Sequence, residues 1–139
     1  PMRRMPVLSP EGKRIVARNV DKGVTRLVII DADNPSATPK LIEVGKITIK
    51  AVHWAGNSRL LLEVIGKDKL FGVEIPIGRL IIFDFATAAS RVADKNSRGI
   101  YGGDVLHVSP DGSWAVIASQ DELFTTPSVK RLVEEFSRP

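Results

Sequence analysis

Two histidines stand at matching places in this chain and are its first candidates for chemistry. His53 precedes Trp54 and His107 precedes Val108, so each comes one residue before an apolar residue that opens a repeated segment. Imidazole titrates near neutral pH, which makes the two histidines candidate contacts for a partner or substrate. A metal site needs further ligands at suitable spacing, and the neighbouring residues supply none. We therefore predict no metal site, and shared repeat positions are the simpler explanation of the pair.

Three aspartates also occupy repeated places. Asp31 and Asp84 each end an apolar run, and Asp111 lies within a polar turn. Paired carboxylates serve acid–base catalysis only where they lie close together. Because Asp31 and Asp84 belong to different repeats, we expect all three aspartates to accept hydrogen bonds from local turns.

No segment has the pattern of a serine hydrolase nucleophile. The Gly-x-Ser-x-Gly elbow places its serine between two glycines, whereas Gly56-Asn57-Ser58 is followed by arginine and leucine. This segment also belongs to a repeated turn rather than to a strand-to-helix elbow. We predict no catalytic residue, no cofactor and no enzymatic activity for this chain alone.

One segment, residues 66–78, interrupts the repeat with an unusual number of apolar side chains. It takes the place of a short turn, and loops longer than the minimum often carry contacts. So many apolar residues are rare in a solvated loop, so we expect the segment to pack on another part of the parent architecture or on a partner. The candidate partner or substrate contacts in it are Leu70, Phe71, Val73, Ile75 and Ile77.

Composition narrows the classes of protein. The 139 residues are 43% hydrophobic, which is enough for a core, and the absence of cysteine excludes disulfides and thiolate metal sites. The net charge is +4, but the basic residues are scattered beside acids and do not alternate with aromatics, so we expect no nucleic-acid partner. No stretch approaches 18 apolar residues, which argues against a membrane span.

The strongest pattern is a segment repeated three times at intervals of roughly 50 residues. Each copy has an apolar residue, a tight polar turn and a second apolar run, and the copies begin at Leu8, Trp54 and Val108. In Ser-Pro-Asp-Gly, proline suits the first central position of a type I turn, and glycine takes the left-handed position that follows. Three copies in phase indicate strands joined by equivalent hairpins, as in propeller blades.

Apolar alternation and turn residues between these copies predict short strands throughout the chain. We expect an all-β fold of antiparallel four-stranded blades, a partial β-propeller of about three blades over residues 1–139. The blades cover approximately residues 6–45, 46–103 and 104–139, the last incomplete, and residues 132–136 suit either a strand or a short helix. The expected strands are residues 13–20, 26–31, 40–44, 47–54, 59–65, 79–85, 90–93, 104–108, 114–118 and 129–136.

The repeated sequences resemble a known repeat. Ser-Pro-Glu-Gly-Lys-Arg-Ile at residues 9–15, followed by Arg-Leu-Val-Ile-Ile-Asp at 26–31 and Arg-Leu-Ile-Ile-Phe-Asp at 79–84, is similar to the Tol-B-like propeller repeat. That repeat also forms the amino-terminal propellers of prolyl oligopeptidase and dipeptidyl peptidase relatives. The similarity covers nearly the whole chain, about residues 6–133.

The resemblance implies the non-catalytic propeller portion of a prolyl oligopeptidase-like serine peptidase, where it would gate or position peptide substrates. The implied partners are the hydrolase domain of a longer parent chain, peptide, or further copies that associate through open blade edges. The alternative is a Tol-B-like protein–protein interaction module unrelated to peptidase chemistry, and a third possibility is a truncated product without a function of its own. The resemblance also suggests the bacterial periplasm, although the first residues have no apolar run typical of a signal peptide.

Overall fold

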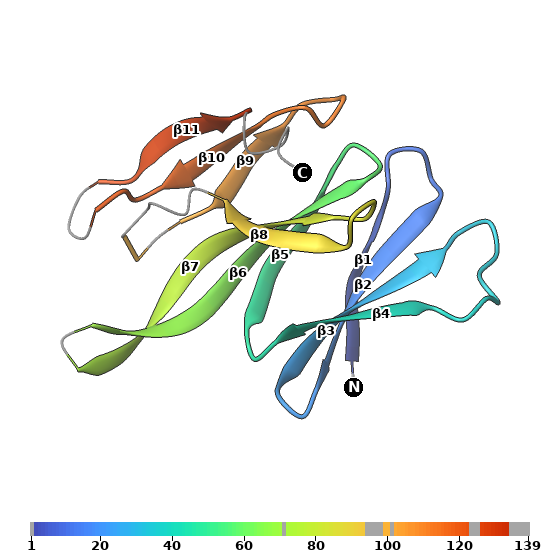
Figure 1. The fold of residues 1–139 in the computed structure, drawn as a ribbon, viewed down its shortest axis with the longest axis horizontal. Helices are drawn as coiled ribbons and strands as arrows, with labels where there is room; N and C mark the ends of the chain where they lie inside the picture. The colour runs from blue at the N-terminus through green and yellow to red at the C-terminus, as the bar shows by residue number, and fades with distance from the viewer. Residues whose placement is uncertain (1, 71, 94–98, 101, 123–125, 134–139) are drawn as a thin grey trace.

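Strands form all the regular structure in the part of the chain that the structure describes (Figure 1). The computed structural model describes residues 2–70, 72–93, 99–100, 102–122 and 126–133. These residues form three antiparallel sheets, and no helix that could cross a lipid bilayer occurs among them. The prediction of an all-β fold with antiparallel four-stranded sheets is confirmed at this level.

The first sheet pairs its strands in chain order. It contains β1 (Met2–Leu8), β2 (Arg14–Asp21), β3 (Val24–Asp31) and β4 (Lys40–Gly45). Side chains 27–29 of β3 are buried one after another, so β3 is covered on both faces, as its unbroken apolar run predicts.

The second sheet has the same order of strands. It contains β5 (Thr48–Ala55), β6 (Arg59–Leu70), β7 (Val73–Asp84) and β8 (Ala89–Ala93). β6 and β7 have 12 residues each and stay paired from Arg59↔Asp84 to Leu70↔Val73. The expectation of a loop over residues 66–78 is therefore wrong, because this segment extends both strands into a long ribbon.

The third sheet has three described strands. It contains β9 (Asp104–Val108), β10 (Ala115–Ser119) and β11 (Ser128–Leu132). β11 begins one residue before the strand expected over residues 129–136 and ends at Leu132. The choice between strand and helix for the last part of that segment lies outside the described residues.

The repeated turns have nearly the same geometry in the first and third sheets. In each, the amide of the glycine donates to the serine carbonyl at 2.9 Å, and the serine hydroxyl accepts the amide of the residue five positions later at 3.1 Å. Gly12 and Gly112 have φ angles of 76° and 75°, the left-handed conformation that favours glycine. The turns therefore join the first two strands of each sheet, as the repeat predicts.

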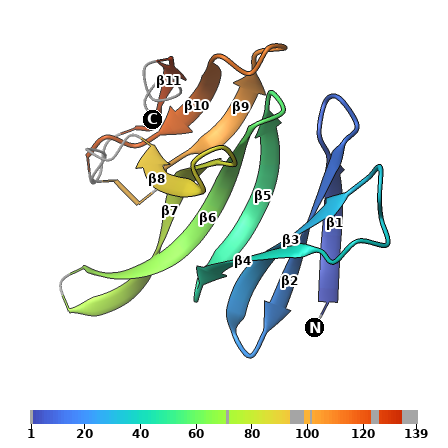
Figure 2. The same ribbon diagram turned by 45° about the vertical axis from the view of Figure 1, so that its right-hand side comes forward.

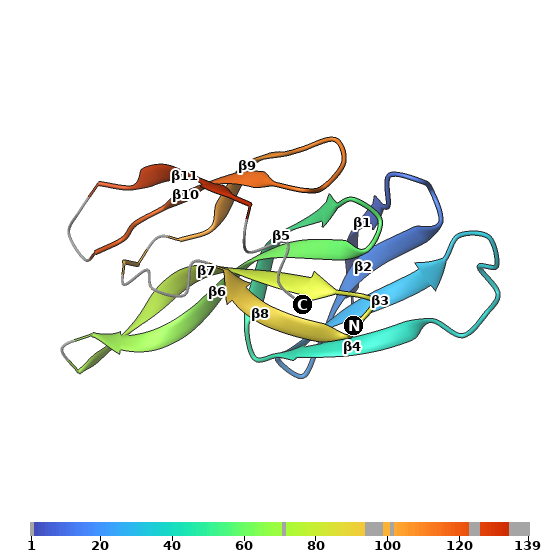
Figure 3. The ribbon, with the colours of Figure 1, turned by 45° about the horizontal axis from the view of Figure 1, so that its top comes forward.

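The sheets stack in chain order, so that the second lies between the other two (Figures 2 and 3). Leu27 and Ile29 of the first sheet pack against the second sheet. The residues at the same places in the repeat of the second sheet, Leu80 and Ile82, pack against the third. We call the face that carries these residues the front face of each sheet and the opposite face the back face. Each front face therefore covers the back face of the next sheet.

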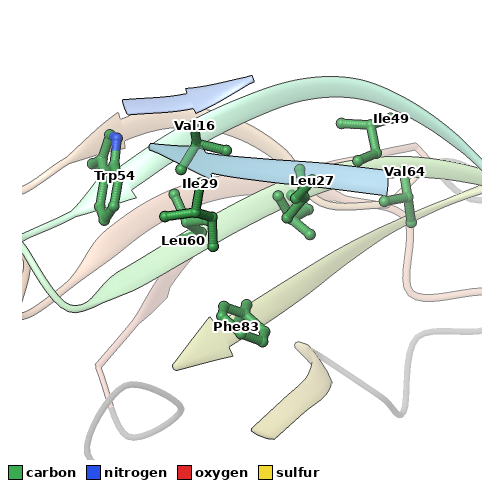
Figure 4. Close-up of a cluster of buried hydrophobic side chains, with 9 residues drawn as sticks. Val16, Leu27, Ile29, Ile49, Trp54, Leu60, Val64 and Phe83 are labelled. Carbon is green, nitrogen blue, oxygen red and sulfur yellow. The ribbon is translucent and has the colours of Figure 1, made fainter. Parts of the chain in front are cut away.

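The central run of β6 shows the consequence of this arrangement. Leu60 and Val64 point back toward the first sheet, where they meet Leu27 and its neighbours (Figure 4). Leu62 belongs to the same cluster. Leu61 points forward to the third sheet. All these side chains are at least nine-tenths buried, and full burial of a leucine contributes about 1.5–3 kcal/mol. A strand buried on both faces has no polar face, which explains the absence of alternation in its sequence.

The two outermost faces of the stack carry exposed apolar side chains, although Val28 on the back face of the first sheet is buried. By strand alternation, Ile15 and Ala17 lie on the back face of the first sheet, beside Leu8 and Leu41 in register. Leu8 is 56% exposed and Leu41 is 60% exposed. On the front face of the third sheet, Val129 is 68% exposed. In the second sheet, the equivalent back and front faces are covered by the first and third sheets.

Candidate functional site

The predicted apolar contacts lie on the ribbon formed by the far ends of β6 and β7. Val73, Ile75 and Ile77 alternate along β7 and so share one face of the ribbon. Val73 is exposed, whereas Ile75 and Ile77 are half-buried. The backbone of Leu70 pairs with Val73 at the tip, and Phe71 lies outside the described residues. The structure therefore gathers the described residues on the paired strands β6 and β7, and their role as partner contacts stays a prediction.

His53 forms a close polar pair with a carboxylate that sequence reasoning did not single out. Its Nε2 lies 2.5 Å from Oε2 of Glu63 on the neighbouring strand β6. The Glu63 side chain is 10% exposed, whereas the histidine is one-third exposed. A buried carboxylate needs such a partner because its desolvation is costly. Its signal in the sequence is a lone charge within the apolar run 60–64.

His107 has different surroundings although it occupies the same place in its repeat. Its ring centroid lies 5.3 Å from that of Trp114, and the Arg131 guanidinium lies over the Trp114 ring, 4.3 Å from its centroid. Each histidine thus contacts residues of its own sheet. Their role as partner or substrate contacts stays a prediction.

A second ion pair links the second and third sheets. Nζ of Lys50 on β5 lies 2.9 Å from Oδ1 of Asp104 on β9. This hydrogen bond and the attraction of the carboxylate raise the pKa of the Lys50 ammonium above its ordinary value. Both side chains are about half exposed, so the ion pair contributes little to stability.

A cavity of about 260 Å³ brings these groups together. Glu63, Lys50 and Asp104 line it with both signs of charge, and Ile65 and Pro76 add apolar walls. Such a mixture of a few polar groups with apolar walls is typical of small ligand sites. The arrangement can bind a ligand with hydrogen-bonding groups and apolar side chains, as in a peptide.

The three aspartates have the local roles expected from sequence. The carboxylate of Asp31 accepts the amide of Asp33 at 2.9 Å, and that of Asp84 accepts the amide of Ala86 at 2.8 Å. Asp111 accepts hydrogen bonds from both serines of its turn, chiefly Ser113, and these lower the pKa of its carboxyl. The aspartates therefore stabilise turns.

Within the described residues, no three histidine, cysteine, aspartate or glutamate side chains form a cluster that could hold a metal ion. Comparison of the chain with protein-family models, with curated proteins and with solved structures found no match. The packing of the sheets and the groups that line their junctions are therefore the features that bear on function.

Proposed function

We propose that the three sheets are consecutive blades of a β-propeller, the third incomplete, and that this chain is the non-catalytic propeller portion of a prolyl oligopeptidase-like serine peptidase. In this role it gates or positions peptide substrates for a separate hydrolase domain. The observation that carries the proposal is the packing of each front face on the next back face, with Leu27 and Leu80 at equivalent places in successive junctions.

This packing supports a propeller over a β-sandwich. A sandwich joins the inner faces of two sheets and leaves their outer faces to solvent. Here the second sheet buries both faces, with Leu60 on one side and Leu61 on the other. Sheets that each pack their front face on the back face of the next sheet can be added until a ring closes.

The junction between the second and third sheets supports a role in peptide positioning. The cavity there offers a carboxylate, an ammonium and apolar walls from residues such as Glu63, Lys50 and Pro76. A peptide presents matching donors, acceptors and apolar side chains. The chain would bind the substrate, and the adjoining hydrolase domain would supply the nucleophile.

The test combines peptide binding with an assay for an active serine. Calorimetric titration of the purified chain with proline-containing peptides should show binding, without release of cleaved products and without labelling by a fluorophosphonate probe. Labelling of a serine together with peptide cleavage would contradict the non-catalytic role. An absence of peptide binding would contradict the positioning role.

The alternative is a Tol-B-like module that binds other proteins and has no link to peptidase chemistry. The exposure of Leu8, Leu41 and Val129 on the outer faces favours it, because exposed apolar faces of this kind often bind protein partners. The coding sequence that adjoins this chain separates the two proposals. A downstream Gly-x-Ser-x-Gly domain would support the peptidase proposal and contradict the alternative.

A further inference from the structure

A groove between the first and second sheets is lined by four cationic side chains. Its volume is about 730 Å³, within the size range of ligand sites. Arg18 extends from β2, Lys46 and Lys50 flank the start of β5, and Lys67 extends from β6. No carboxylate is present among the described residues that line this groove. We call it the basic groove.

Two side chains that line the basic groove donate hydrogen bonds to backbone carbonyls. The Thr25 hydroxyl donates to the Ile47 carbonyl at 2.5 Å, and the Arg18 guanidinium donates to the Ile49 carbonyl. These bonds occupy backbone acceptors of the β5 segment and fix the guanidinium at the junction. A ligand in the groove would therefore meet mainly positive charge and apolar surface from Ile47 and Ile49.

Two of the cations pair with carboxylates that are not among the lining residues of the basic groove. Lys50 pairs with Asp104 at 2.9 Å, and Nζ of Lys67 lies 3.4 Å from Oε1 of Glu74. These two lysines and their two carboxylate partners are all at least half exposed. Exposed pairs of this kind contribute little to stability, so their lysines can turn to a bound anion at small cost.

We propose that the basic groove binds acidic peptide segments, with glutamate or aspartate side chains on its lysines and apolar side chains on its floor. This inference rests on the proposed function, because it adds a second peptide contact beside the cavity between the second and third sheets, with which the basic groove shares Lys50. Charge-assisted hydrogen bonds from lysine to carboxylate supply the preference for acidic residues. Nucleic acid fits less well, since the described lining residues include no aromatic ring on which a base could stack.

The experiment measures fluorescence anisotropy with two labelled synthetic peptides. One carries two glutamates separated by apolar residues, and the other has glutamine at both places. The test variant combines Lys46→Glu with Lys67→Glu. The control combines Lys13→Glu with Lys40→Glu, two exposed lysines outside the basic groove, and so changes the net charge equally. Thermal melts of both variants check that they fold.

The glutamate peptide should bind at least about tenfold more tightly than the glutamine peptide. The groove variant should lose that preference, whereas the control should retain it within about threefold, because distant exposed charges are screened by salt. Equal weakening by both variants, or equal binding of both peptides, would overturn the inference and leave the proposed function intact. If neither peptide binds, the result would count against the proposed function as well.

Discussion

Gly112 in the turn of the third sheet lies so close to Gly56 in the turn of the second that a β-carbon on Gly112 would overlap the Gly56 amide nitrogen. The turn of the first sheet joins the same row, because the Glu11 amide donates to Oδ1 of Asn57 at 2.9 Å. Arg14 adds a bond to the Asn57 carbonyl at 2.8 Å. The three repeated sequences thus meet at one edge of the stack.

Gly112→Ala should destabilise the protein more than Gly12→Ala does. Both glycines are left-handed, which costs alanine about 1–2 kcal/mol. Only Gly112 has backbone atoms where the new methyl group would lie, and such overpacking adds about 1–3 kcal/mol. Urea unfolding of the two variants measures the difference. Equal losses would contradict the contact between the turns.

His53→Ala should destabilise the protein by about 1–3 kcal/mol, the usual cost of leaving a buried polar group without its partner. The group left behind is the Glu63 carboxylate. His107→Ala is the matched control, since His107 has the same repeat position but is exposed, and it should change stability by less than about 0.5 kcal/mol. Chemical denaturation at pH 7 compares them. If the two variants lose the same stability, the His53–Glu63 pair has no special role.

Leu61→Ala should cost about 2–5 kcal/mol, because Leu61 is fully buried between the second and third sheets. Leu41→Ala removes an equally large side chain from an open face and should cost less than about 0.5 kcal/mol. Differential scanning calorimetry of both variants gives the comparison. A small loss for Leu61→Ala would show that the third sheet does not cover the second.

The stabilising effect of Asp111 should disappear in acid. Its hydrogen bonds lower the pKa of the carboxyl in the folded protein, so they stabilise the fold fully above the unfolded pKa of about 3.9. That stabilisation is lost as pH falls through the lowered folded value. Asp111→Asn should therefore melt below the parent protein at pH 7, and the gap should narrow below about pH 4. A gap that is constant with pH would contradict this account.

Much of the sheet structure could be predicted from local sequence. The Ser-Pro-Asp-Gly type of turn marked where the first and second strands of each sheet meet, and the unbroken run in β3 indicated a strand covered on both faces. Both signals depend on a few adjacent residues, which is why they could be read without knowledge of the packing.

The ribbon and the polar pair depended on information that local sequence lacks. Val73, Ile75 and Ile77 alternate as a strand does, but the segment takes the place of a short turn in the repeat and so resembled an inserted loop. The contact between His53 and Glu63 is set by the pairing of β5 with β6, which places His53 opposite Leu61 and so diagonally across from Glu63.

The front-to-back packing of equivalent faces is the relationship on which the proposed propeller depends, and solution mass tests it most directly. The open back face of the first sheet, with Leu8 and Leu41, corresponds to faces that are covered elsewhere in the stack. Light scattering across a dilution series should therefore show head-to-tail association that increases with concentration, and Leu41→Glu should weaken it. A monomer at every concentration that melts cooperatively would contradict the account.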